Sequence, residues 1–94
     1  MIIAVDFDGT LKVQGKPNIK LINCLREHQA RGDVVILWSC REGTRLKEAV
    51  AYLQKHGLFP NLVNRNHPDA IRMMGHDSRK IYADLYIDNK NFAR

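Results

Sequence analysis

Apolar residues gather in four short runs along the chain, at residues 2–5, 34–38, 62–64 and 83–87. The second run is apolar at every position and begins with two β-branched residues, Val34 and Val35. An uninterrupted run of this kind predicts a strand that is covered on both faces, as in the centre of a parallel sheet. We therefore expect four strands, with residues 34–38 in a central position.

Two segments between these runs, residues 18–30 and 44–56, have apolar residues spaced as in amphipathic helices. The apolar faces comprise Ile19, Ile22, Cys24 and Leu25 in the first segment and Leu46, Ala49, Val50 and Leu53 in the second. Each segment therefore predicts a helix that buries one side. Residues 65–79 form a more polar connection, in which residues 69–74 are expected to make one or two helical turns.

The alternation of strand and helix predicts an α/β, Rossmann-like domain with three layers. Right-handed crossovers place helices on both faces of a parallel sheet. The connections leave room only for a small flap with a tight turn at Gln14-Gly15 and for the loop at residues 65–79. We therefore expect residues 1–94 to form one domain without a cap domain.

Composition narrows the functional classes. The longest apolar run is too short to span a bilayer, and the N-terminus lacks a charged leader, so we expect a cytoplasmic protein that does not contact a membrane. Cys24 and Cys40 are isolated, which agrees with a reducing compartment. The net charge of +5 favours an anionic partner, although no basic stripe or nucleic-acid-binding motif is present.

The residues that carry chemistry follow the predicted strands. The first strand runs directly into Asp6-Phe7-Asp8-Gly9-Thr10, Ser39 follows the second, and Asp88 follows the fourth, with Lys80 shortly upstream. Ligands of open α/β sheets bind outside the carboxyl ends of the strands. Carboxylates, a hydroxyl group and an ammonium group that converge there predict phosphoryl chemistry.

These segments resemble the motifs of the haloacid dehalogenase (HAD) superfamily. The resemblance lies in Asp6-Phe7-Asp8-Gly9-Thr10, Ile36-Leu37-Trp38-Ser39, Lys80 and Tyr86-Ile87-Asp88, in an order and spacing that cover almost the whole chain. The stretches at residues 37–43 and 78–88 look closest to the short, capless HAD hydrolases of bacteria and phages. The resemblance implies that the four strands, numbered along the chain, lie in the order 3-2-1-4.

The resemblance, together with the chemistry of the side chains, implies a role for each acid. Asp6 is the expected nucleophile, which forms an aspartyl phosphate. Asp8 is the expected general acid and base, with a pKa raised by nearby anions. Magnesium is the expected cofactor, held by Asp6, the carbonyl of Asp8 and Asp88. Lys80 would stabilise the transition state as a positive charge.

The predicted substrate-binding residues are Thr10, Ser39, Cys40, Arg41 and Lys80. Purely structural explanations stay open for several of these residues. Ser39 and Glu42 have the spacing of a capping box for the second helix. Cys40 is better explained as a small buried thiol than as a nucleophile, and Lys80 is also interpretable as a surface lysine. Asp84, Arg41 and Glu42 are either supporting residues of the site or ordinary residues at the start of a strand and a helix.

The sequence also departs from the family pattern. Asn89 follows Asp88 where many relatives have a second acid, which is expected to weaken metal binding. The sequence ends at Arg94, where relatives usually continue with another helix and often a strand. An exposed face or edge would then favour a homo-oligomer.

We therefore predict a magnesium-dependent phosphate monoester hydrolase, and the alternative is a non-catalytic phosphate-binding or regulatory module. A third interpretation, a basic nucleic-acid-binding protein, predicts binding of oligonucleotides without phosphate release. The expected substrate is a nucleotide, a phosphorylated nucleic-acid end or a phosphoprotein, because an open site needs a large substrate to exclude water. A basic rim is expected from Lys12, Lys16, Arg41, Arg65 and Lys90.

Overall fold

A computed structural model of the chain describes residues 1–77 and 80–89. At the centre of the fold lies a parallel sheet of β1 (Ile2–Val5), β4 (Val34–Leu37), β5 (Leu62–Val63) and β6 (Leu85–Ile87). The strand order is β5-β4-β1-β6, and every neighbouring pair is parallel. This is the predicted order 3-2-1-4 and confirms the Rossmann-like α/β arrangement.

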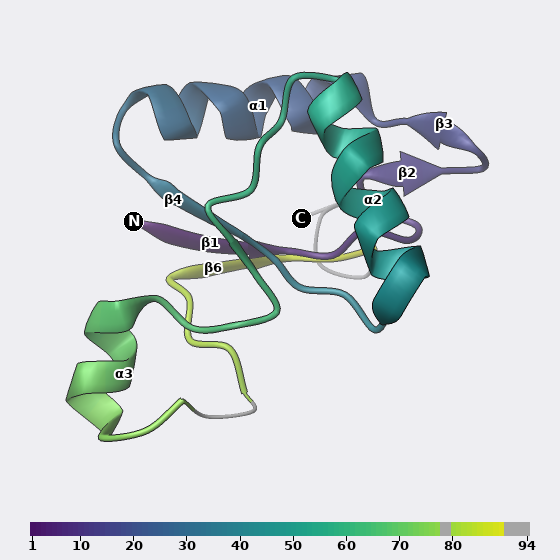
Figure 1. Cartoon of the computed structure of the whole chain (residues 1–94). Coiled ribbons are helices and arrows are strands. Elements are labelled where there is room, and N and C mark those ends of the chain that lie inside the picture. The colour runs from purple at the N-terminus through teal and green to yellow at the C-terminus, as the bar shows by residue number, and fades with distance from the viewer. Residues whose placement is uncertain (78–79, 90–94) are drawn as a thin grey trace.

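Two helices, α1 (Ile19–Ala30) and α2 (Gly43–Lys55), lie on one face of the sheet (Figure 1). The other face carries the connection between β5 and β6, which includes the short helix α3 (Pro68–Met74). Both faces are therefore covered, although the second layer is mostly irregular chain. None of the helices in the described part of the chain is long and apolar enough to span a bilayer.

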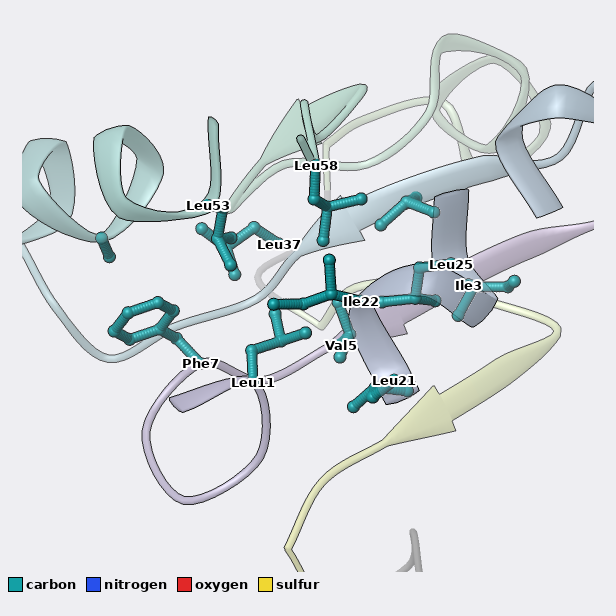
Figure 2. Close-up of a cluster of buried hydrophobic side chains, with 12 residues drawn as sticks. Ile3, Val5, Phe7, Leu11, Leu21, Ile22, Leu25, Leu37, Leu53 and Leu58 are labelled. Atoms are coloured by element: carbon teal, nitrogen blue, oxygen red, sulfur yellow. The ribbon is translucent and has the colours of Figure 1, made fainter. Parts of the chain in front are cut away.

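The main hydrophobic core lies between the sheet and the helices α1 and α2 (Figure 2). Its largest buried side chains are Ile3, Val5, Phe7, Leu11, Leu21, Ile22, Leu25, Leu37, Leu53 and Leu58. Complete burial of such a side chain stabilises a fold by about 1.5–3 kcal/mol. A smaller cluster of Ala4, Ile36, Ile81 and Ala83 lies on the opposite face of the sheet.

The helices begin and end close to the predicted positions, but the apolar face of α1 differs from the prediction. Leu21, Ile22 and Leu25 are buried, whereas Ile19 is 49% exposed and Cys24 is exposed. Successive residues of a helix are rotated by about 100°, so Cys24 points away from the side that Ile22 buries. The assignment of Ile19 and Cys24 to the buried face was therefore wrong.

The flap after β1 is a hairpin of β2 (Lys12–Val13) and β3 (Lys16–Pro17), paired antiparallel. Gln14 and Gly15 have φ angles of 51° and 77°, as in the two-residue turns that match the twist of a hairpin. This confirms the predicted tight turn. Asn18 then caps α1, because its side-chain oxygen accepts a hydrogen bond from the backbone N–H of Leu21 at 3.3 Å.

Candidate active site

The segment that follows β1 folds into a tight loop around the carbonyl group of Phe7. This oxygen accepts hydrogen bonds from the backbone N–H groups of Thr10, Leu11 and Lys12, at 3.2, 3.0 and 3.1 Å. Gly9 has a φ angle of 76°, and a Cβ atom there would lie 3.4 Å from the side-chain nitrogen of Asn89. The left-handed backbone conformation therefore favours a glycine at this position, while the distance to Asn89 is that of an ordinary contact.

A cavity of about 280 Å³ opens at the carboxyl edge of the sheet, and its described lining is Asp6, Trp38, Ser39, Cys40, Asp88 and Asn89. These residues follow β1, β4 and β6, which are neighbours in the sheet. Four residues of the predicted site, Asp6, Ser39, Cys40 and Asp88, therefore lie around one cavity. They converge because parallel strands all end at the same edge.

Asp6 is partly buried in this cavity. Burial raises the pKa of its carboxyl group, and the negative charges of Asp8 and Asp88 raise it further, against a hydrogen bond from the backbone of Phe7 that lowers it. The backbone N–H of Asp6 donates to the carbonyl of Ile87 at 3.0 Å, which keeps this residue in line with β6. The site therefore concentrates negative charge in a way that a bound cation would relieve.

Asp8 points to Arg41 instead of into the cavity. Its two carboxylate oxygens accept hydrogen bonds from Nη2 and Nε of Arg41 at 2.8 and 2.9 Å, and the same guanidinium group lies 4.8 Å from the centre of the Phe7 ring. This pairing lowers the pKa of Asp8. The prediction of a raised pKa was wrong, because the nearest charge is a cation that the fold brings from the loop before α2.

Ser39 is held by two hydrogen bonds. Its backbone N–H donates to Oδ1 of Asn64 at 2.7 Å, and its hydroxyl oxygen accepts from the backbone N–H of Arg41 at 3.1 Å. The predicted capping box is wrong: α2 begins later, with Glu42 as its N-cap, and the described residues give Glu42 no side-chain capping bond. Ser39 thus orders the loop that carries Arg41.

Cys40 is exposed at the cavity, so the expectation of a buried thiol was wrong. The loop between β4 and α2 projects beyond the sheet and buries little. Thr10 is buried, and its carbonyl oxygen accepts a hydrogen bond from Nδ2 of Asn18 at 3.0 Å, which ties the hairpin to the start of α1. It does not belong to the described lining of the cavity, and its substrate-binding role stays a prediction.

Lys80 is exposed and lines a neighbouring hollow with Met74, Tyr82 and Tyr86. Its carbonyl oxygen accepts a hydrogen bond from the side-chain amide of Asn66 at 3.3 Å. The described lining of the cavity around Asp6 does not include it. Its contact with a phosphoryl group therefore stays a prediction. Residues 78 and 79, which belong to the same sequence motif, and Lys90 of the expected rim lie outside the described residues.

From the sequence, Asp84, Arg41 and Glu42 were considered as supporting residues of the site. Asp84 and Glu42 have structural roles away from the cavity or at the surface. Asp84 accepts a hydrogen bond from the backbone N–H of Ile2 at 2.7 Å, at the end of the sheet opposite the cavity. Glu42 is an exposed N-cap. Arg41 is the exception, because it contacts Asp8 directly.

Sequence reasoning missed Trp38, Asn64 and Asn89 as residues that build the site. Trp38 was assigned to a strand and a sequence motif, and Asn89 to a departure from a motif that weakens metal binding, but neither was predicted to line the cavity, as both do. Asn64 holds Ser39 from a left-handed backbone conformation with φ of 52°. An asparagine directly after a short strand was the available signal, because this residue tolerates that conformation.

The residues fit a hard, oxygen-bound cation. Among the described residues, no group of three or more His, Cys, Asp or Glu side chains is placed to hold a metal ion. Magnesium does not require such a group, since it is commonly bound through one or two carboxylates and keeps several waters. The carboxylates of Asp6 and Asp88 on the same cavity satisfy that requirement.

Fold and site together define a Rossmann-like α/β protein with acidic residues at the carboxyl edge of its sheet. No family model and no curated protein matches the chain. Among solved structures, it is similar to a conserved protein from Bacteroides thetaiotaomicron, at 37% sequence identity and a TM-score of 0.83, over 99% of this chain and 78% of that one. The chain belongs to the same family as that conserved protein.

Proposed function

We propose that the protein is a magnesium-dependent phosphate monoester hydrolase of the HAD type. The observation that carries this proposal is the single cavity where the ends of β1, β4 and β6 bring together Asp6, Ser39 and Asp88. Such a site joins a carboxylate nucleophile, a hydroxyl donor for a phosphoryl oxygen and a second carboxylate for a cation.

The reaction proceeds in two steps. A carboxylate oxygen of Asp6 attacks phosphorus, the bond to the ester oxygen breaks, and the leaving alcohol takes a proton from Asp8. Water then attacks the phosphorus of the aspartyl phosphate and gives a proton to Asp8. The bond to Asp6 breaks, and inorganic phosphate leaves.

Arg41 decides when Asp8 can take part. While Arg41 holds both carboxylate oxygens, Asp8 favours the ionised form and has no proton to donate. A phosphate dianion in the cavity competes for the same guanidinium group. Substrate binding therefore releases Asp8 from Arg41, and Asp8 takes up a proton from solvent, which it donates to the leaving oxygen in the first step.

The carboxylates of Asp6 and Asp88 and the backbone carbonyl of Asp8 would hold magnesium. When bound, the ion would neutralise negative charge on the phosphoryl oxygens. Ser39 and Lys80 would orient the phosphoryl group.

A second candidate function is a non-catalytic phosphate-binding module. Asn89, an amide on the wall of the cavity, and the occupied carboxylate of Asp8 favour this candidate. It predicts phosphate binding without turnover.

The test is release of inorganic phosphate from a panel of phosphate monoesters, first with magnesium, then with a chelator, and then with magnesium restored. We expect release only when magnesium is present and none from the Asp6→Asn variant. Saturable binding of inorganic phosphate without release from any ester would support the non-catalytic module and overturn the hydrolase.

A further inference from the structure

Trp38 is a partly exposed aromatic residue directly after the buried strand β4. The three residues before it, Val35, Ile36 and Leu37, are fully buried in β4, whereas Trp38 is 40% exposed. It also forms part of the wall of the cavity that contains Asp6 and Asp88. A partly exposed indole on the wall of this cavity is available to stack on a bound ligand.

The register of the sheet places Trp38 directly beside Asp6. Val5 pairs with Leu37, and the backbone N–H of Trp38 donates to the carbonyl of Val5 at 2.8 Å, so Trp38 and Asp6 occupy the next matching positions. Side chains at matching positions of parallel neighbours project on the same side. Neighbouring strands are about 4.8 Å apart, so the indole begins beside the proposed nucleophile.

The indole is held in place by a second aromatic residue. The ring of Tyr86 meets the indole nearly edge-on, with ring centres 5.9 Å apart and planes at 67°. The Tyr86 hydroxyl group accepts a hydrogen bond from the backbone N–H of Ala83 at 3.0 Å and donates one to the carbonyl of Ile81. Trp38 is therefore a positioned ring, which costs little ordering on binding a ligand.

We propose that Trp38 stacks on the base of a nucleoside phosphate, so that the substrates of the site are nucleoside monophosphates and nucleic-acid ends that carry a terminal phosphate. This inference rests on the proposed function for the position of the phosphate. An aromatic surface next to a phosphate site, in a chain of net charge +5, combines the two forces that bind nucleotides without reading their sequence.

The position of the ring favours a nucleoside over an aryl phosphate. In-line displacement sends the leaving group away from Asp6, along the axis of attack. Trp38 lies to the side of Asp6, so a ring that stacks on it must be displaced from that axis. The ribose between phosphate and base allows this displacement, whereas the ring of phosphotyrosine is joined directly to the leaving oxygen.

The chain contains one tryptophan, so fluorescence excited selectively in tryptophan, and not in the three tyrosines, reports on Trp38 alone. We would titrate the full chain, as Asp6→Asn in magnesium to prevent turnover, with adenosine monophosphate, ribose 5-phosphate, adenosine and phosphotyrosine. We expect saturable quenching by adenosine monophosphate, binding about tenfold or more tighter than ribose 5-phosphate measured by competition, and weaker binding of adenosine. Equal affinity for the two phosphates, or strongest quenching by phosphotyrosine, would overturn the proposal.

A matched pair of variants gives the kinetic test in the active chain. Trp38→Leu should reduce the preference for adenosine monophosphate over ribose 5-phosphate, as a ratio of kcat/KM, by about tenfold. Phe59→Leu removes a side chain that is 60% exposed outside the described lining of the cavity, and should leave the ratio unchanged.

The two proposals fail in different ways. Phosphate release without any preference for the nucleotide would overturn the role of Trp38 and leave the hydrolase standing. Quenching by adenosine monophosphate without release from any ester would overturn the hydrolase and support the nucleotide site.

Discussion

Asp6 occupies a position that disfavours its own charge. Its pKa is raised in the folded chain, chiefly by burial and further by Asp8 and Asp88. For an acid with a raised pKa, stability is lost as the pH rises from the unfolded-state value of about 3.9 through the folded-state value. At neutral pH the ionised Asp6 therefore destabilises the fold, while the proposed reaction needs that charge.

We predict that Asp6→Asn lowers turnover by about 10⁴-fold or more and leaves the Tm at pH 7 equal or higher. The amide keeps the shape and removes both the attacking charge and the repulsion. Steady-state kinetics and thermal unfolding on the same preparation measure both effects. Retained turnover would exclude covalent catalysis by Asp6, and a lowered Tm would contradict the electrostatic argument.

Arg41 is predicted to matter for substrate binding more than for stability. Its pair with Asp8 leaves the carboxylate side chain 57% exposed, and exposed pairs contribute about 0–1 kcal/mol. We expect Arg41→Ala to reduce kcat/KM by about 10- to 100-fold, mainly through KM, with little change in Tm. Arg41→Lys should keep only part of the kcat/KM of the parent chain, because an ammonium group cannot bind bidentately.

Arg45→Ala is the matched control for Arg41. Arg45 is an exposed cation on the next turn and also lowers the pKa of Asp8 through its charge, but only its backbone carbonyl contacts Arg41. Equal losses in the two variants would show that general positive charge acts at the site, and would contradict a specific role for Arg41.

Asp88 and Asn89 are neighbours on the cavity wall with different predicted roles. Asp88→Ala should raise the magnesium concentration for half-maximal activity by about tenfold or more, and Asn89→Ala should raise it less. Asn89→Asp should lower it if the missing second carboxylate limits metal affinity. Magnesium titrations of the three variants test the ranking, and the reverse order would contradict the assignment of Asp88 as the ligand.

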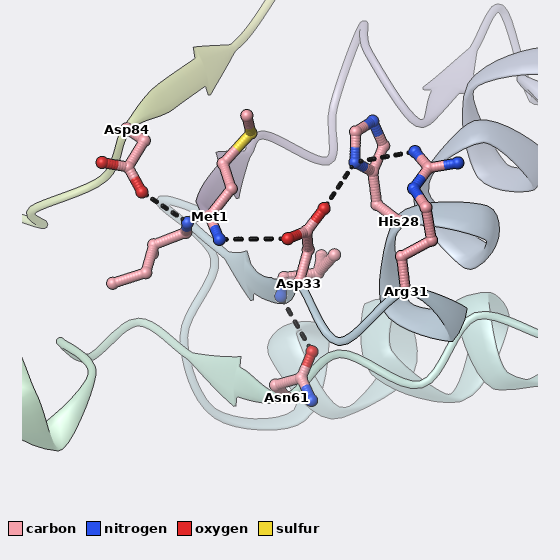
Figure 3. Close-up of polar contacts among 8 residues, drawn as sticks. Met1, His28, Arg31, Asp33, Asn61 and Asp84 are labelled. Atoms are coloured by element: carbon pink, nitrogen blue, oxygen red, sulfur yellow. Dashed lines mark hydrogen bonds and ion pairs between the residues drawn. The ribbon is translucent and has the colours of Figure 1, made fainter.

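At the scale of the elements, hydrogen bonds and ion pairs connect the amino-terminal ends of the strands, opposite the cavity, to neighbouring segments (Figure 3). Asp33, in the turn between α1 and β4, accepts hydrogen bonds from the Met1 amino group at 3.0 Å and pairs with Nδ1 of His28 at 2.9 Å. Asn61 accepts a hydrogen bond from the backbone N–H of Val35 at 2.8 Å. These contacts join the starts of β1 and β4 to α1 and to the segment before β5.

Asp33 makes this edge sensitive to acid. His28 and then the Met1 amino group lower its pKa. A lowered pKa contributes stability that is present above the unfolded-state value of about 3.9 and is lost as the pH falls through the folded-state value. We predict that Asp33→Asn lowers the Tm modestly at pH 6 and that the difference from the parent chain shrinks as the pH falls below the unfolded-state value of about 3.9.

Thermal unfolding across this pH range measures the effect, with Asp69→Asn as the control. Asp69 pairs with Arg72 on the exposed surface of α3, away from the sheet edge. The activity of Asp33→Asn should stay unchanged, because the substitution lies at the opposite edge from the cavity. Identical Tm values of Asp33→Asn and the parent chain at pH 6 would show that the ion pairs of Asp33 contribute nothing measurable to stability.

At the scale of the whole molecule, the site is open and the charge is positive. The described connections consist of a two-stranded flap and a loop with one short helix, so nothing among the described residues forms a cap over the cavity. Part of the expected basic rim is already engaged: Arg41 pairs with Asp8, and the Lys12 ammonium group lies 4.9 Å from the centre of the Tyr52 ring. Steering by the remaining charge should therefore be moderate.

We predict that kcat/KM for a 5′-phosphorylated oligonucleotide falls several-fold between about 50 and 200 mM salt, and that for a mononucleotide falls less. The longer polyanion loses more attraction when the positive potential is screened. Initial rates at matched ionic strengths test this. If the two substrates respond equally, the net charge does not help to select the substrate.

The sequence alone was sufficient to predict the sheet, its strand order and the meeting of Asp6, Ser39 and Asp88. Four apolar runs separated by helical segments allow few parallel arrangements, because crossovers are right-handed. The place of the last strand beside the first came from the resemblance to the HAD superfamily, since strands that follow one another in sequence otherwise tend to be neighbours. Once the strands are parallel, residues that directly follow them meet at one edge. These conclusions depend on backbone periodicity, which a sequence displays directly.

Only the tertiary structure decided where the loop side chains point. The turn around the Phe7 carbonyl directs Asp8 to Arg41, and this pairing reversed the expected shift in the pKa of Asp8. Because α2 begins only after Glu42, the Ser39 hydroxyl group accepts a hydrogen bond from the Arg41 backbone instead of capping the helix. Register brought Trp38 beside Asp6. The contact of Asp8 with Arg41 joins residues 33 positions apart. Both lie in irregular segments, where no repeating pattern constrains side-chain direction, so this direction depends on three-dimensional packing.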